Sequence, residues 1–194
     1  IPLERIAEIA RAAPPDLATF LLTSETSAAG ILSQQRRVGA SVLQLVDRPR
    51  PGTHAELRAA LPGVRLVQVV HVTGPESLAE AREHVAEGVD ALLLDSGNPQ
   101  AAVKELGGTG RVHDWGLSRQ IRDESAAAGV PVFLAGGLGP DNVAAAVAAV
   151  QPYGVDVCSR LRDNQAGALS EEITARFIAA ARGGGSGGDQ RERS

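Results

Sequence analysis

The 194-residue chain is long enough for one ordinary domain, and its 43% hydrophobic content argues against a disordered protein. Its net charge is −4 and it has no long basic run, so we expect no nucleic-acid partner. No apolar run reaches the roughly 18 residues of a membrane span, so we expect no membrane partner either. The single cysteine, Cys158, excludes an internal disulfide and makes the cytoplasm the simplest compartment.

Short runs rich in Val and Leu recur along the chain and predict β-strands. They are apolar almost throughout rather than alternating, which is the pattern of parallel strands covered on both faces. The six expected strands lie at residues 17–23, 41–46, 64–72, 91–95, 130–135 and 154–158.

Helical patterns fill the intervals between these strands and predict an α/β fold. The expected helices lie at residues 2–11, 27–38, 54–60, 76–87, 115–128, 143–150 and 170–182. Alternation with short connections indicates a parallel sheet with right-handed crossovers. Six strands would satisfy an open doubly wound sheet, whereas a (β/α)8 barrel would need two more. We expect one domain over 1–182 and a disordered Gly-rich tail over 183–194.

Active sites of parallel α/β proteins gather where the strands end, so the residues after each strand are the first candidates. The fourth strand is followed by a Gly-rich loop that ends in Asp114, just before a helix. Asp114 is either only a helix N-cap or a carboxyl group that transfers a proton. The two roles compete for the same carboxylate oxygens.

Two further strand ends carry candidate groups. Gly136 and Gly137 expose backbone N–H groups that suit a phosphate, although a tight turn without a ligand explains them as well. Asp156 lies in an apolar strand and is costly to bury without a partner. Ser159 and Arg160 follow where an anion could be held, and Cys158 is more typical of a small buried hydrophobe than of a nucleophile.

The four histidines show no metal-ligand spacing, so we expect no metal site. His84 is expected to be solvated on its helix. His71 ends a strand and is the one candidate among them for a functional role. The other two histidines are His54 and His113.

Four sequence blocks, taken in order and with their spacing, resemble the phosphoribosylanthranilate isomerase family. They are LLLDS at 92–96, GGTGRVHDW at 107–115, LAGGLGPDNV at 134–143 and GVDVCS at 154–159. The resemblance is strong from about residue 90 to 182 and weaker before that. It implies a (β/α)8 barrel and an Amadori rearrangement, in which a general acid opens the ribose ring and a general base takes a proton from C2. It implies no cofactor.

The resemblance also assigns roles to residues of this chain. Asp114 is expected to be the general acid. Asp156, Gly108 and Thr109 are expected to contact the substrate. The phosphate is expected to be held by Gly136, Gly137, Ser159 and Arg160. Asp114 and the amides near Gly136 should therefore converge on one rim of the barrel.

This chain also departs from the family pattern. The family's base is a cysteine in a Lys-x-Cys-Gly stretch on the first strand, and nothing here matches it. Residue 1 falls just after the family's second strand, so we expect the first two strands to lie outside this sequence. The alternative is a protein that lacks them and has an open six-stranded sheet with exposed edges. A family histidine is replaced in Gln44-Leu45-Val46-Asp47. Arg160 stands in place of a glycine whose N–H faces the phosphate, so it either pairs with the phosphate or blocks its pocket.

Three functions remain open from the sequence. The first is an isomerase of N-(5'-phosphoribosyl)anthranilate, or of a related phosphoribosyl aminoaldose, in tryptophan biosynthesis. The second is a divergent homologue, which either binds a sugar phosphate without turnover or is an enzyme with another substrate. The third is a purely structural barrel. For the first, the partner is a small phosphorylated sugar, and the protein is a monomer or a homodimer.

Overall fold

The computed structural model describes residues 1–96, 114–163 and 167–184, in which strands and helices alternate as expected. The strands are β1 (Phe20–Thr23), β2 (Val42–Leu45), β3 (Arg65–His71), β4 (Ala91–Asp95), β5 (Val132–Leu134) and β6 (Gly154–Val155). The helices are α1 (Leu3–Ala12), α2 (Ala28–Val38), α3 (Thr53–Ala60), α4 (Glu76–Ala86), α5 (Trp115–Ala127), α6 (Val143–Val150) and α7 (Glu171–Gly184), with a short 3-10 turn η1 (Ser159–Leu161).

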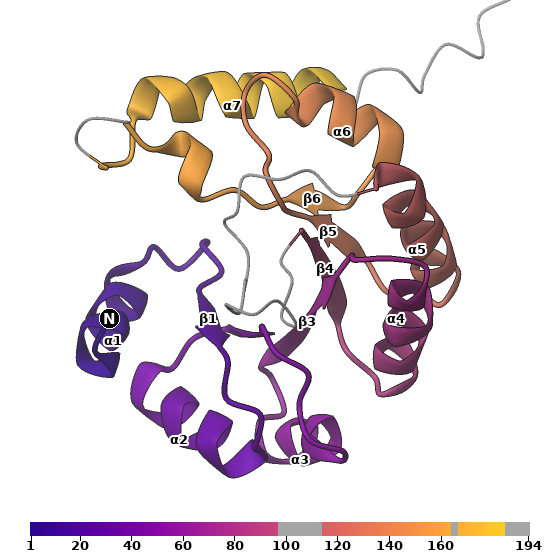
Figure 1. Cartoon of the computed structure of the whole chain (residues 1–194). Helices are drawn as coiled ribbons and strands as arrows, with labels where there is room; N and C mark the ends of the chain where they lie inside the picture. Colours follow the sequence, from indigo (N-terminus) through magenta and orange to yellow (C-terminus); the bar gives the residue numbers. More distant parts are fainter. Residues whose placement is uncertain (97–113, 164–166, 185–194) are drawn as a thin grey trace, which may run out of the picture.

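The strands form one parallel sheet in the order β1-β2-β3-β4-β5-β6, which is also their order in the chain. A doubly wound sheet reverses its strand order at one point, so this order excludes it. Figure 1 shows the sheet curving into an arc with all helices on its outer side. The strands of the described part therefore follow one another around the arc in a single direction, as they do in a barrel.

The outer face of the sheet packs against the helices. One cluster joins β1, β2 and β3 to α2 and α3 through residues such as Leu43 and Ile31, both fully buried. A second joins β3, β4 and β5 to the later helices through residues such as Leu94 and Ile121, also fully buried. These aliphatic contacts explain why the strand runs are apolar and the helices amphipathic.

The inner face of the sheet carries a smaller apolar cluster made of strand and strand-end residues, including Val42, Val69 and Leu93. The expectation that every strand is covered on both faces is wrong for β1. Phe20 and Leu22 pair with Val42 and Gln44, which places them on the inner face, yet they are 41% and 58% exposed. The described residues cover this side of β1 only in part.

The C-terminal helix runs further than expected. Gly183 and Gly184 belong to α7, so a tail beginning at Gly183 is wrong by two residues. A Cβ on Gly184 would lie 2.7 Å from the carbonyl oxygen of Ala144, so only a glycine lets this last turn lie against α6. Residues 185–194 lie outside the described residues. Within the described ranges, no helix has the length and apolarity to cross a membrane.

Candidate active site

A cavity of about 290 Å³ opens at the carboxyl ends of the strands. Its wall includes Gln44, Val69 and Leu93 from the inner face of the sheet. The polar groups at its rim come from the end of β4 and from the segments that follow β5 and β6. These are Asp95, Gly136, Gly137, Asp156, Cys158 and Ser159. The structure therefore brings together four of the expected site residues, namely Asp156, Gly136, Gly137 and Ser159.

Asp95 is a cavity residue that the sequence reasoning did not assign to the site. It is the last residue of β4 and only 8% exposed, and its Oδ1 accepts a hydrogen bond from the N–H of Ser96 at 2.8 Å. Burial raises the pKa of Asp95, while the Ser96 hydrogen bond and the nearby His71 act to lower it. One feature of the sequence could have identified Asp95 as a site residue, because it is a carboxylate at the end of an apolar strand. A carboxylate buried in such a place needs a partner or a function.

Asp156 faces the same cavity from the residue after β6. Its side chain keeps contact with solvent at the cavity mouth, yet desolvation by the surrounding protein raises its pKa, and the negative charge of Asp95 raises it further. The cavity therefore holds two carboxyl groups that resist being ionised together.

Gly136 and Gly137 form a loop that a side chain would disrupt. Both have left-handed backbone conformations, with φ of 84° and 63°. A Cβ on Gly136 would lie 2.7 Å from the backbone nitrogen of Ser96, so the loop packs tightly against the end of β4. No described residue accepts a hydrogen bond from the N–H of either glycine. These amides remain available to an anion.

Arg160 lies beside this loop but not in the cavity wall. Its guanidinium donates to both carboxylate oxygens of Asp141, at 2.7 and 2.9 Å, and to the carbonyl of Gly137 at 3.2 Å. The Arg160 contact is the largest influence that lowers the pKa of Asp141. In this conformation the arginine contacts the glycine loop from outside the cavity and stabilises it through the Gly137 carbonyl.

Asp114 caps α5, as one of its two expected roles requires. Its Oδ1 accepts hydrogen bonds from the N–H groups of Gly116 and Leu117, at 2.8 and 3.2 Å. Among the described residues, none donates to its other oxygen, so capping occupies one oxygen and leaves the second for proton transfer.

The structure does not place Asp114 in the cavity with the glycine loop. It lines a separate hollow of about 510 Å³ with residues that include Val72, Thr73 and Leu117. Val72 and Thr73 directly follow β3, so this hollow opens at the same end of the sheet. Convergence of Asp114 and Gly136 on a single ligand stays a prediction. Gly108 and Thr109 lie outside the described residues, as does His113.

Three other expectations from the sequence have outcomes in the structure. Cys158 is exposed, so the expectation of a small buried residue is wrong. His84 is 1% exposed, so its expected solvation is also wrong. His71 is buried at the end of β3, and its Nε2 lies 3.1 Å from the carbonyl oxygen of Val46.

Comparison with known proteins agrees with this arrangement. A family model described as N-(5'-phosphoribosyl)anthranilate (PRA) isomerase matches residues 3–179. The chain is 43% identical over 182 residues to N-(5'-phosphoribosyl)anthranilate isomerase of Haloferax volcanii, covering 94% of this chain and 76% of that protein. It is 36% identical over 184 residues to the Myxococcus xanthus protein of the same name, covering 94% of this chain and 79% of that protein.

A solved structure gives the same result for the fold. Phosphoribosyl anthranilate isomerase from Thermococcus kodakaraensis superimposes with a TM-score of 0.75 at 28% identity, covering 94% of this chain and 82% of that one. The fold is thus that of a (β/α)8 barrel, of which the described part forms six consecutive strands. The chain belongs to the phosphoribosylanthranilate isomerase family.

Proposed function

We propose that this protein catalyses the Amadori rearrangement of N-(5'-phosphoribosyl)anthranilate in tryptophan biosynthesis. The observation that carries the proposal is the cavity at the strand ends, where two carboxyl groups face a glycine loop in a chain of this family. The substrate is then a small phosphorylated sugar derivative, and the compartment is the cytoplasm. No finding favours the alternative of a divergent homologue.

The phosphate end of the substrate is assigned to the glycine loop. Successive backbone N–H groups in a turn can form a concavity that binds anions, and Gly136 and Gly137 lie in the turn after β5. The Gly136 and Gly137 amides have no acceptor among the described residues, and the Ser159 side chain lines the same cavity. Arg160 supports this subsite by holding the Gly137 carbonyl.

The acid–base chemistry is assigned to carboxyl groups. Asp114 is the general acid that protonates the ring oxygen as the ribose opens, because it keeps one oxygen free of capping. Asp156 contacts the substrate inside the cavity. We assign no base among the described residues, because the resemblance gives that role to a cysteine in a Lys-x-Cys-Gly stretch that this sequence does not contain.

The test is the loss of phosphoribosylanthranilate fluorescence in the presence of the purified protein. Consumption that falls in Asp114→Asn supports the proposal, and unchanged turnover in that variant removes Asp114 from it. A protein without turnover that ribose 5-phosphate nevertheless stabilises against heat supports the sugar-phosphate binder instead.

A further inference from the structure

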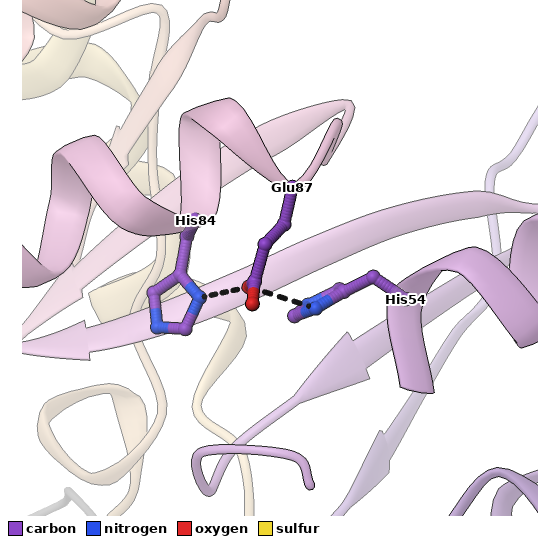
Figure 2. A group of neighbouring side chains, drawn as sticks. All are labelled: His54, His84 and Glu87. Carbon is purple, nitrogen blue, oxygen red and sulfur yellow. Dashed lines mark hydrogen bonds and ion pairs between the residues drawn. The ribbon is translucent and has the colours of Figure 1, made fainter. Parts of the chain in front are cut away.

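Two histidines and a glutamate meet on the helix side of the sheet, outside the cavity (Figure 2). His54 is the second residue of α3, His84 lies in the last turn of α4, and Glu87 caps α4. Glu87 Oε2 lies 3.0 Å from His54 Nδ1 and 3.1 Å from His84 Nδ1. The side chains of His54 and His84 are only 5% and 1% exposed.

The tautomer of His54 follows from its other neighbour, Gln68 on β3. The Gln68 amide nitrogen donates toward three backbone carbonyls, those of Leu45, Asp47 and Val69, at 3.1 to 3.2 Å. The amide oxygen must therefore face His54 Nε2, 3.2 Å away. Because that oxygen can only accept, Nε2 carries the proton.

A neutral His54 with its proton on Nε2 has a lone pair on Nδ1, directed at the Glu87 carboxylate. Two electron-rich atoms 3.0 Å apart need a positive species between them, which is either a proton on Nδ1 or a bound metal ion. Histidines that bind metals show this pattern, in which the second ring nitrogen donates to a protein oxygen and fixes the ligating nitrogen.

His84 presents its Nδ1 to the same carboxylate oxygen. Its Nε2 is buried and has no hydrogen-bond partner among the described residues, but it lies 3.7 Å from Glu80 Oε1. Without an ion, Nδ1 is placed to donate a hydrogen bond to Glu87. A metal ion bound to Nδ1 would instead leave the proton on Nε2, which faces Glu80.

We propose that His54, His84 and Glu87 form a binding site for a divalent transition-metal ion, Zn²⁺ in the first instance. Their ligand atoms all lie within 4.8 Å of one another. Ligands of a tetrahedral zinc ion with bonds of about 2.1 Å lie roughly 3.4 Å apart, so small side-chain movements suffice. The Glu87 side chain is 42% exposed, which gives the ion a path from solvent and leaves water as a fourth ligand.

Charges of both signs surround the two histidines. The carboxylates of Glu87 and Glu80 face them. The guanidinium of Arg58 acts on His54, and that of Arg48 acts on the two carboxylates. A bound ion would fasten the start of α3 to the end of α4. The expectation of no metal, drawn from histidine spacing, misses such a site because its ligands come from two separate helices.

The test uses untagged protein freed of metal with a chelator. Titration with Zn²⁺ in a calorimeter should give one site per chain. Zn²⁺ at about a hundredfold excess over its Kd should raise the melting temperature by roughly 5–10 °C. Co²⁺ should produce the visible absorption bands of a tetrahedral site. Absence of one-to-one binding by the parent protein would overturn the proposal.

Substitutions locate the ion. Glu87→Gln keeps the side-chain volume and should weaken Zn²⁺ binding at least tenfold, whereas Glu83→Gln on the same helix should leave it unchanged. Cys158→Ser should also bind normally, which excludes the exposed thiol as the ligand. If Glu87→Gln fails to fold, NMR of the parent decides, because Zn²⁺ must shift the ring signals of both His54 and His84. Unshifted rings, or normal binding in folded Glu87→Gln, would refute the site. None of these readouts depends on isomerase activity.

Discussion

Asp95 and Asp156 line one cavity, and the negative charge of Asp95 adds to desolvation in raising the pKa of Asp156. Two acids that disfavour each other's ionisation hold a proton more readily than either would alone in water. This relationship distinguishes the cavity from an ordinary turn region, and its effect on stability can be measured.

Asp95→Asn should stabilise the protein at neutral pH. Because burial raises the pKa of Asp95 in the folded state, the folded protein holds this proton more tightly than the unfolded chain. The stability from Asp95 is therefore present below the unfolded pKa and is lost as the pH rises through the folded pKa. Asparagine still accepts from the Ser96 N–H but cannot ionise.

We expect a rise in melting temperature on the order of 2 °C at pH 7 for Asp95→Asn, which disappears in acid below the unfolded pKa. Asp16→Asn, at an exposed position, makes the same change in net charge and is the control. A benefit that is the same at every pH, or that is matched by the control, would contradict the assignment.

Asp114→Asn should separate catalysis from capping. Asparagine caps helices as well as aspartate does, so α5 should keep its end and the melting temperature should hardly change. Loss of the acid should slow turnover of phosphoribosylanthranilate by about 10²–10⁴-fold. Asp114→Ala should in addition lose about 1 kcal/mol of stability. A variant Asp114→Asn with parental turnover would leave capping as the only role.

Gly136→Ala should destabilise the fold by about 1–3 kcal/mol in urea denaturation. The alanine backbone would have to adopt a φ of 84°, and its Cβ would lie 2.7 Å from the backbone nitrogen of Ser96. Gly63→Ala is the matched control, because its Cβ would meet no atom within 4 Å and its φ is not in the positive range. Equal costs for the two variants would show that the loop does not need a glycine at 136.

Arg160→Gly should weaken ribose 5-phosphate binding by roughly 3–10-fold, since the loop loses the hydrogen bond to the Gly137 carbonyl and a nearby positive charge. Calorimetry would measure the change. The control is Arg162→Gly, which removes a guanidinium that donates to Gly167 instead. Tighter binding in Arg160→Gly would mean that this arginine obstructs the phosphate pocket.

Leu43→Ala should cost about 2–5 kcal/mol, because Leu43 is fully buried between the sheet and the helices. Leu22→Ala removes the same atoms from the exposed inner face of β1 and should cost less than about 1 kcal/mol. Urea denaturation of both variants gives the comparison. Similar costs would show that the inner face of β1 is covered in solution.

The sequence predicts the fold well, because the strands that are buried in the sheet appear in the sequence as apolar runs. Each apolar run becomes a strand of the sheet, although the outermost residues, such as Val130 and Cys158, lie beyond the paired segments. What the pattern does not reveal is which faces stay open. Phe20 and Leu22 look like core residues, and only the pairing with β2 places them on the partly covered side.

The site is predicted less evenly. Gly136, Gly137 and Asp156 lie in one cavity, as expected of groups at the ends of parallel strands, whereas Asp114 lines a separate hollow. The sequence does not show that Arg160 is bound by Asp141, because the two lie 19 residues apart. Nor does it show that His84 faces inward, because the contact with Glu87 and His54 depends on how α3 and α4 pack.

The consecutive order of the strands has a consequence for how the molecule opens. Each strand pairs only with the strands that come before and after it in the chain. The contacts that stabilise the sheet are therefore between neighbouring units, as in a linear repeat protein. The outermost strands, β1 and β6, each have a single neighbour within the described residues, whereas β3 and β4 are held on both sides. In a protein of these 194 residues, amide exchange should therefore be slower in β3 and β4 than in β1 and β6.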